Sequence, residues 1–231
     1  MQSDVMVTSR SFDEYAAFFA LDPNALPPRI IDVSAGAAGF TAEANRRGSR
    51  AVAVDPTYAL EAEALTERVR AGITRGQGMI DDNHVRYTYA WYGSAEQRTR
   101  LRAAALADFL ADRQDHPERY VTGALPRLPF DDDSFDLALC SHLLFTWADV
   151  FDEAWHDAAL AELLRIAPEV RIFPFALRGA GDAIEFVPRV LDRLRRAGHG
   201  VEVRATAYEF QVDVKDVLVL TRGAAQSSKS R

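Results

Sequence analysis

Two features near the start of the chain have the composition and spacing to bind a nucleoside. An apolar run at 29–33 leads into Ser-Ala-Gly-Ala-Ala-Gly at 34–39, where small residues let the main chain approach a ligand closely. Asp55 ends the next apolar run, 19 residues after Gly36. Because a carboxylate can accept hydrogen bonds from both hydroxyls of a ribose, the two features together predict a nucleoside site.

Each feature also has a simpler interpretation. Ser34 and Ala38 stand where a full dinucleotide fingerprint has glycines, so the loop alone is consistent with a turn that uses small residues for packing. Asp55 precedes Pro56, as a capping aspartate often does. The combination of both features in one strand-helix-strand unit favours the ligand site.

A second group of chemically able residues lies further along the chain. Cys140 ends an apolar run, and Ser141 and His142 follow it, at the edge of the sheet where open α/β folds bind ligands. His142 is a candidate general base toward a hydroxyl or amine, and a structural hydrogen-bonding histidine is the alternative. Cys140 is expected to be a buried small hydrophobe rather than a nucleophile.

Aromatic residues gather at 87–92, and two more follow the run that ends at Cys140. They are Tyr87, Tyr89, Trp91, Tyr92, Phe145 and Trp147. Aromatic faces attract a desolvated cation, so one interpretation is a cage around a charged ligand. The other is a hydrophobic core under an inserted helix, because the alternation at 87, 89 and 91 is also that of an ordinary strand face.

The elements that position these residues are predicted by apolar periodicity, which alternates between strands and helices. We expect strands at 29–33, 51–54, 137–140, 169–176, 201–210 and 217–222, another ending near 121, and helices at 39–47, 59–71, 95–113, 158–165 and 183–196. The last two strands should form an antiparallel pair at the end of a mostly parallel sheet. A helix at 11–20, capped by Ser11 with Glu14, precedes the sheet.

Composition limits the class of protein. The 231 residues suffice for one α/β domain, expected over 1–222, with 223–231 as a disordered tail. The 27 basic and 34 acidic residues give a net charge of -7, which disfavours nucleic acid as a partner. The apolar stretches are too short for a bilayer span, so we expect no membrane association.

Cysteine and metal-ligand counts narrow the chemistry further. The single cysteine excludes an internal disulfide and a cysteine-rich zinc site, and it is typical of a reducing compartment, so a cytoplasmic location is expected. Asp81 and Asp82 lie beside His84 without a further ligand at a suitable spacing. We therefore predict no metal site.

The chain resembles the class I S-adenosylmethionine (SAM)-dependent methyltransferases over about 29–222. The resemblance rests on the loop at 32–39, on Asp55, on the terminal strand pair and, most specifically, on the run LPFDDDSFDLALCSHLLF at 128–145. It implies a Rossmann-like α/β sandwich with a mostly parallel seven-stranded sheet. The terminal strand pair would be antiparallel, and a helical insertion at 59–119 would follow the second strand.

The same resemblance implies a SAM site. Asp55 would bind the ribose, Ala124 with Leu125 would contact the adenine, and Pro56 and Cys140 would join the cofactor-binding set. Gly36 and Ala37 of the first loop would hold the methionine part, and Asp32 and Ser34 would also belong to the cofactor-binding set. Many relatives carry an aspartate near the position of Ala124, so in this chain main-chain groups would have to bind the adenine amino group.

The activity implied is methylation of a small molecule at O or N, as in small-molecule biosynthesis, by in-line displacement at the sulfonium methyl. Holding the reacting atoms in line supplies much of the catalysis, so a dedicated base is not required. His142, Ser141 and Tyr15 are the candidate catalytic residues. Residues 1–28 would form a helical lid or cap, with Arg10 near the cofactor's carboxylate, or would pack as part of the core.

Two alternatives for the function stay open, and the sequence pattern indicates neither the acceptor nor the oligomeric state. In a methyltransferase-like cyclase, the amino group of SAM would attack its own side chain, forming azetidine-2-carboxylic acid and releasing methylthioadenosine. A SAM-binding protein without turnover is the second alternative. A dinucleotide oxidoreductase is disfavoured, because no second mononucleotide-binding half follows Cys140.

Overall fold

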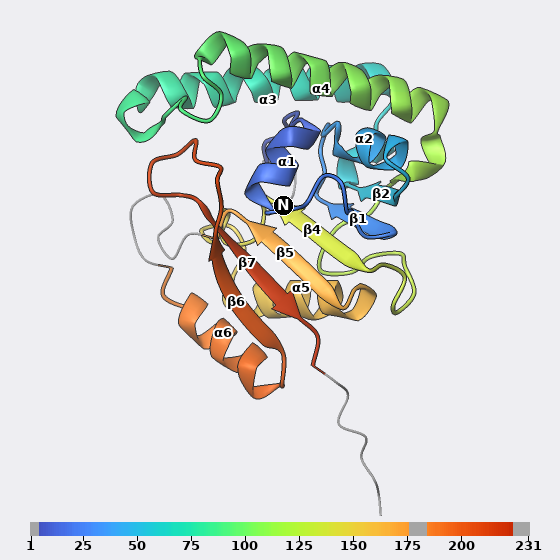
Figure 1. Ribbon diagram of the computed structural model, residues 1–231, viewed down its shortest axis with the longest axis vertical. Coiled ribbons are helices and arrows are strands. Elements are labelled where there is room, and N and C mark those ends of the chain that lie inside the picture. The colour runs from blue at the N-terminus through green and yellow to red at the C-terminus, as the bar shows by residue number, and fades with distance from the viewer. Residues whose placement is uncertain (1–4, 176–183, 224–231) are drawn as a thin grey trace, which may run out of the picture.

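The strands form one mixed sheet (Figure 1). A computed structural model describes residues 5–175 and 184–223, and in this part of the chain the strand order is β3-β2-β1-β4-β5-β7-β6. The strands are β1 (Arg29–Val33), β2 (Arg50–Val54), β3 (Tyr120–Val121), β4 (Leu137–Ser141), β5 (Glu169–Phe173), β6 (Gly200–Ala205) and β7 (Asp216–Thr221). β7 is antiparallel to both of its neighbours, and the other pairs are parallel. The predicted mostly parallel seven-stranded sheet with an antiparallel terminal pair is confirmed.

The strand register brings three chain segments to one edge of the sheet. Val33 of β1 pairs with Val54 of β2 on one side and with Cys140 of β4 on the other. Because these strands are parallel, the residues that follow them lie together at the carboxyl edge: Ser34, Asp55 and Ser141.

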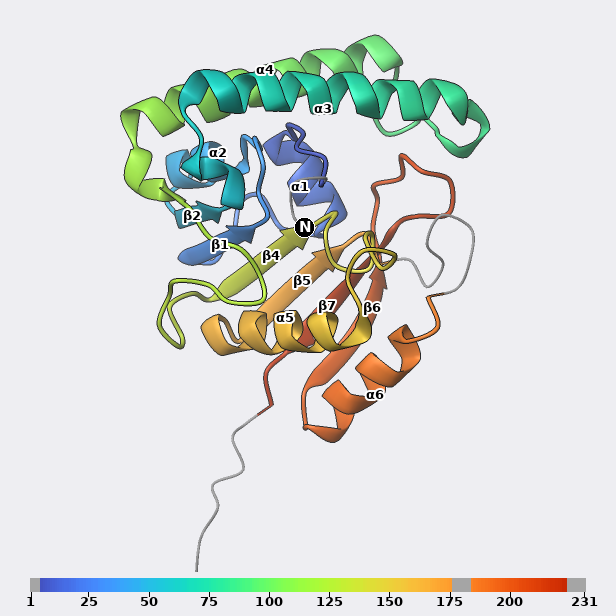
Figure 2. The same ribbon diagram turned by 180° about the vertical axis from the view of Figure 1, so that it is seen from behind.

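Helices cover both faces of the sheet (Figures 1 and 2). They are α1 (Phe12–Phe18), α2 (Phe40–Arg46), α3 (Ala62–Asp82), α4 (Ala95–Asp115), α5 (Glu153–Ile166) and α6 (Val187–Arg196). Helices α5 and α6 lie on one face, and α1 and α2 lie on the other. Helices α3 and α4 lie side by side as an outer layer over α1 and α2, and they form the helical insertion that was predicted after the second strand.

Helix α1 is part of the hydrophobic core. Tyr15, Phe18 and Phe19 are fully buried, and the Phe18 ring stacks on that of Phe173 with centroids 4.6 Å apart. The predicted capping box is present, because Glu14 N–H donates to the Ser11 hydroxyl and the Ser11 N–H donates back to the Glu14 carboxylate. The segment before α1, residues 5–10, is the part of the N-terminus that lies near the loop at 34–39.

Helix α3 is longer than predicted. The expected helix at 59–71 begins at Ala62 and continues past Gly72 to Asp82. Glycine has low intrinsic helix propensity, so the three glycines between 72 and 78 favour a helix end there. In the structure, packing overrides this propensity and the helix continues. The start of α5 was also predicted too late: the Asp152 side chain accepts a hydrogen bond from Trp155 N–H and begins the helix at Glu153.

Two strands end earlier than predicted. Strand β5 stops at Phe173, because the following Pro174 has no N–H to donate to a neighbouring strand. Strand β6 stops at Ala205, and residues 206–215 turn toward the α3–α4 connection, where Thr88 N–H donates to the Phe210 carbonyl. Ala183, the predicted start of the sixth helix, and the tail at 224–231 lie outside the described residues.

Candidate active site

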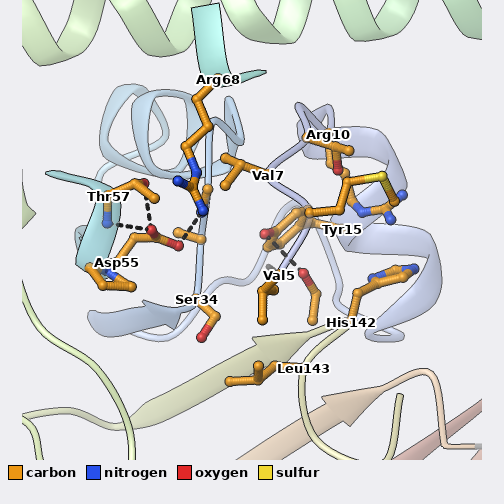
Figure 3. Close-up of a pocket in the computed structure, with 16 residues that line it drawn as sticks. Val5, Val7, Arg10, Tyr15, Ser34, Asp55, Thr57, Arg68, His142 and Leu143 are labelled. Carbon is orange, nitrogen blue, oxygen red and sulfur yellow. Dashed lines mark hydrogen bonds between the residues drawn. The ribbon is translucent and has the colours of Figure 1, made fainter. Parts of the chain in front are cut away.

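A pocket opens at the carboxyl edge of β1, β2 and β4 (Figure 3). Its walls come from the N-terminal segment, α1, the glycine loop at 34–39, the residues that directly follow β2, helix α3 and the residues that directly follow β4. The lining residues are Val5, Met6, Val7, Thr8, Arg10, Tyr15, Ser34, Ala35, Gly36, Asp55, Pro56, Thr57, Arg68, Ser141, His142 and Leu143. Ligands of open α/β folds bind at this edge of the sheet, so this pocket is the candidate active site.

The glycine loop is held open by its backbone conformation. Ser34 and Gly36 both have a left-handed φ, at 60° and 57°, and Ser34 N–H donates to the Val54 carbonyl at 2.8 Å. A Cβ on Gly36 would lie 3.1 Å from the Thr8 carbonyl oxygen, which is a tight contact. Glycine is therefore required at 36 for both space and conformation, whereas Ser34 takes a conformation that glycine would take more easily.

The N-terminal segment lies directly on this loop. Ala37 N–H donates to the Thr8 carbonyl at 3.2 Å, and Gly39 N–H donates to the Arg10 carbonyl at 2.9 Å. The Ser9 hydroxyl donates to the Arg102 carbonyl of α4 at 2.8 Å. Residues 5–10 are thus fixed between the loop and the outer helices, and they form one wall of the pocket.

Asp55 is both a capping residue and a pocket residue. One carboxylate oxygen accepts hydrogen bonds from the Thr57 N–H at 2.9 Å and from the Thr57 hydroxyl. The other accepts from Gly36 N–H at 3.0 Å. Each carboxylate oxygen has two lone pairs, so the oxygen bonded to Gly36 retains an acceptor site for a ligand hydroxyl.

Asp32 lies one layer behind the lining residues, at the end of β1. Its carboxyl accepts a hydrogen bond from the Tyr15 hydroxyl at 3.3 Å, and the same hydroxyl lies 3.3 Å from Ser141 Oγ. Its other oxygen, Oδ2, is buried without a hydrogen-bond partner among the described residues. Burial raises the pKa of the Asp32 carboxyl well above its usual range, and the nearby Asp55 charge adds to the rise.

His142 presents a neutral imidazole. Its main-chain N–H donates to the Phe173 carbonyl at 2.6 Å, and its φ is 55°. The ring atom Nδ1 is buried and has no hydrogen-bond partner in the described part of the chain. Burial, with Arg10 and Arg102 nearby, holds the pKa of His142 well below its usual value. The ring is therefore uncharged at neutral pH and can accept a proton or a hydrogen bond.

The chain after β4 is fixed by a second histidine, which the sequence reasoning missed. Phe145 N–H donates to His156 Nε2 at 3.0 Å, and His156 Nδ1 lies 2.8 Å from the Asp152 carbonyl oxygen. Because Nε2 accepts, Nδ1 carries the proton, and the ring bridges the loop to α5. The spacing of His156, four residues after the helix cap Asp152, is the sequence signal that could have indicated this contact.

Most of the predicted site residues meet in this pocket. The predicted residues that line it are Tyr15, Ser34, Gly36, Asp55, Pro56, Ser141 and His142. Ala37 is buried behind the loop. Cys140 is buried in the core, and burial raises the pKa of its thiol to about 12, as expected for a structural cysteine.

The predicted adenine contacts lie outside the pocket lining. Ala124 and Leu125 follow β3 and form a turn in which Arg127 N–H donates to the Ala124 carbonyl at 3.2 Å. Their role in binding adenine stays a prediction. The lining residues that the sequence analysis did not single out are Val5, Met6, Val7, Thr8, Thr57, Arg68 and Leu143.

The aromatic residues of the insertion pack as a core. Trp91 and Tyr92 contact Tyr208, with ring centroids 5.1 and 6.0 Å apart, and Tyr92 is buried. Neither Trp91 nor Tyr92 lines the pocket, so the geometry fits the hydrophobic-core interpretation better than a cage. The described residues contain no group of His, Cys, Asp or Glu side chains able to hold a metal ion. Nor does any described helix combine the length and apolarity needed to cross a membrane.

Comparisons with known proteins agree with this geometry. Residues 94–168 match the family described as a methyltransferase domain. The chain is 27% identical to the uncharacterized protein MJ0045 of Methanocaldococcus jannaschii over 95% of this chain and 97% of that protein.

One solved structure shares the fold, and a second is reported for comparison. The magnesium protoporphyrin IX methyltransferase of Synechocystis PCC 6803, solved with bound SAM, has a TM-score of 0.50 and 12% identity over 92% of this chain and 78% of that one. A TehB-like SAM-dependent methyltransferase of Corynebacterium glutamicum has a TM-score of 0.46 and 16% identity, covering 87% of this chain and 83% of that one. The predicted resemblance is confirmed at the level of the fold, and residues 94–168 match a methyltransferase domain.

Proposed function

We propose that this chain binds SAM and transfers its methyl group to O or N of a small molecule. The observation that carries the proposal is the convergence of two sets of residues on one pocket. The glycine loop and Asp55 form one side of it, and Tyr15 and His142 form the other (Figure 3). The first set has the chemistry of a nucleoside site, and the second can position an acceptor.

The residues present fit a cationic nucleoside ligand. Gly36 leaves space for close approach, and Asp55 retains an acceptor site for a ribose hydroxyl. Asp32 Oδ2 is a buried acceptor without a partner in the described structure, and from one layer behind the lining its carboxyl favours the ammonium group of an amino acid on this side of the pocket. When bound, SAM supplies an electrophilic methyl group on a sulfonium.

The residues on the other side of the pocket would orient and deprotonate the acceptor. Burial and the Asp32 charge raise the pKa of the Tyr15 hydroxyl well above its usual value, so this hydroxyl stays protonated and donates to Asp32. It therefore accepts from Ser141, which fixes the serine beside the pocket. His142 Nδ1 is the acceptor that can take the nucleophile's proton, and the low pKa keeps it neutral beforehand.

One observation favours the cyclase as a second candidate. Residues 5–10 cover the glycine loop through two main-chain hydrogen bonds, and Val5, Val7 and Leu143 contribute apolar side chains to the pocket. A covered apolar wall suits a reaction within one ligand, from which water and an acceptor are excluded.

Product analysis separates these functions. The purified full chain is first titrated with S-adenosylhomocysteine in a calorimeter and then incubated with SAM, alone and with a small-metabolite extract. S-adenosylhomocysteine that forms from SAM only when the extract is present supports the methyltransferase. Methylthioadenosine that forms from SAM alone supports the cyclase. Binding without either product indicates a protein without turnover, and failure to bind SAM or S-adenosylhomocysteine overturns the proposal.

A further inference from the structure

A buried group of charged side chains lies between α1 and α4, next to the pocket. In the described structure it contains three arginines, Arg10, Arg98 and Arg102, together with the carboxylate of Glu14. Glu14 has no exposed surface, and Arg102 is 7% exposed. The group therefore carries more positive than negative charge around a Glu14–Arg102 pair that is shielded from water.

Glu14 is already fully engaged by other groups. Its Oε1 accepts from the Tyr92 hydroxyl at 2.6 Å and from Arg102 Nε at 3.0 Å, and Arg102 Nη2 lies at the same distance. Its Oε2 accepts from Ser11 N–H at 2.7 Å. Arg102 is thus the arginine that pairs with this carboxylate.

Arg10 reaches the same carboxylate only weakly. Its guanidinium lies 3.8 Å from Glu14 Oε1, beyond hydrogen-bond distance. Burial and the charge of Arg102 lower the pKa of Arg10, so the positive charge of this guanidinium is incompletely compensated by its surroundings. Arg10 lines the pocket, so an anion bound there would reach its guanidinium and restore the balance of charge.

Arg98 is directed elsewhere. Its guanidinium lies 4.6 Å from the centre of the Phe210 ring, and its Nη1 donates to Gln77 at 3.4 Å. It does not line the pocket. Among the three arginines, Arg10 is therefore the one placed to meet a ligand.

The position of Arg10 separates it from the predicted ribose site. Arg10 and His142 lie on one side of the pocket, and Asp55 and Thr57 lie on the other, with Arg68 extending toward Asp55 (Figure 3). Arg10 and Arg102 also act on the charge of His142, the candidate proton acceptor. The cationic side of the pocket is therefore the side at which an acceptor would be deprotonated.

We propose that the acceptor carries a carboxylate and that Arg10 binds it. This proposal rests on the proposed methyltransferase function and names the chemical class of its substrate. A guanidinium binds a carboxylate through two parallel hydrogen bonds, which fixes orientation as well as charge. The bound carboxylate would hold the nucleophilic atom of the acceptor near His142 Nδ1. Because the His142 ring is neutral, it does not compete with Arg10 for the carboxylate. The carboxylate of the cofactor itself is the competing source of the same chemistry.

The test compares carboxylates with amides of the same shape. Benzoate and benzamide, and propionate and propionamide, are titrated into the full chain with and without saturating S-adenosylhomocysteine, and binding is followed by calorimetry and by the NMR signals of labelled histidines. We expect each carboxylate to bind at least about tenfold more tightly than its amide, which corresponds to roughly 1.4 kcal/mol. Equal binding of the two in the wild-type protein overturns the proposal without any variant.

Variants assign the preference to one arginine. Arg10→Gln should abolish the preference for carboxylates, Arg10→Lys should retain part of it, and Arg100→Gln, at an exposed position on α4, should leave it unchanged. S-adenosylhomocysteine should bind Arg10→Gln as tightly as it binds wild type. A preference for carboxylates that survives in Arg10→Gln contradicts the proposal. If Arg10→Gln loses affinity for S-adenosylhomocysteine and the wild-type protein shows no carboxylate preference, the proposal is also contradicted, and Arg10 is assigned to the cofactor. If S-adenosylhomocysteine fails to bind wild type, the proposed function fails, while titration of the free protein still decides the carboxylate site.

Discussion

Gly72 of α3 lies directly against the main chain of Val7, so that a Cβ atom at position 72 would collide with the Val7 carbonyl oxygen. Gly72→Ala should therefore displace residues 5–10 from the glycine loop and weaken S-adenosylhomocysteine binding. Limited proteolysis near the N-terminus and calorimetry measure the two effects.

Gly78 on the same helix is the matched control for this substitution. A Cβ at position 78 would meet nothing within 4 Å. Gly78→Ala should therefore stabilise the protein by about 0.5–1 kcal/mol through helix propensity and leave ligand binding unchanged. Equal effects of the two substitutions on binding would show that the contact with Val7 does not hold the segment.

Asp55→Ala should weaken S-adenosylhomocysteine binding by about 1–3 kcal/mol, because it removes a charge-assisted hydrogen-bond acceptor for the ribose. It also releases Gly36 N–H and Thr57 N–H, so the glycine loop should become more mobile in hydrogen exchange. Asp81→Ala removes an exposed carboxylate from α3 and serves as the control. Calorimetry that shows the same affinity for Asp55→Ala and wild type would refute the ribose assignment.

Asp32→Asn should raise the melting temperature of the ligand-free protein at neutral pH. Burial raises the folded-state pKa of this carboxyl above its unfolded value of about 4, so ionisation favours the unfolded chain. The contribution of Asp32 to the free energy of unfolding is therefore highest below about pH 4, and it falls as the pH rises toward the folded-state pKa. Asparagine does not ionise and can still accept from Tyr15.

The expected gain is therefore present at pH 7 and absent at about pH 4, and melting curves across this range measure it. The same substitution should weaken S-adenosylhomocysteine binding, because asparagine offers no carboxyl group that could ionise when the ammonium group of the ligand binds nearby. A variant that is less stable than wild type at pH 7 and binds ligand equally well would contradict both expectations.

Cys140 should resist thiol reagents in the folded protein. The side chain is fully buried and its pKa is raised to about 12, so hardly any thiolate forms near pH 8. Since this is the single cysteine of the sequence, its modification should follow the rate of opening of the core. Rapid modification of the native protein, measured by mass spectrometry, would show that the end of β4 is accessible.

Sequence reasoning worked best where local pattern and tertiary structure agree. β1 at 29–33 was predicted with its observed bounds, because it is a short apolar run in the centre of the sheet. The Ser94 cap of α4 was likewise predicted, and its side chain accepts from Gln97 N–H. The same patterns brought the glycine loop, Asp55 and His142 to one sheet edge, as the structure places them.

What the sequence did not predict depends on contacts between distant segments. Helix α3 continues past its expected end, and the close packing of Gly72 against Val7 in that part of the helix is not encoded by local propensity. The contribution of residues 5–8 to the pocket has the same origin, because short segments outside regular elements carry little periodicity. The pairing of Glu14 with Arg102 joins positions 88 apart, so the charge imbalance at Arg10 could be recognised only in three dimensions.

The hydrogen bond from Ser9 to the Arg102 carbonyl has a consequence for the order of folding. It joins residues 93 apart in sequence, and contacts at long separation form after local ones because the loop between them must close first. The strands β1 and β2 with α2 can assemble while residues 5–10 are still free. The wall of the pocket is then a late product of folding, completed when residues 5–10 meet α4, which is synthesised long after them.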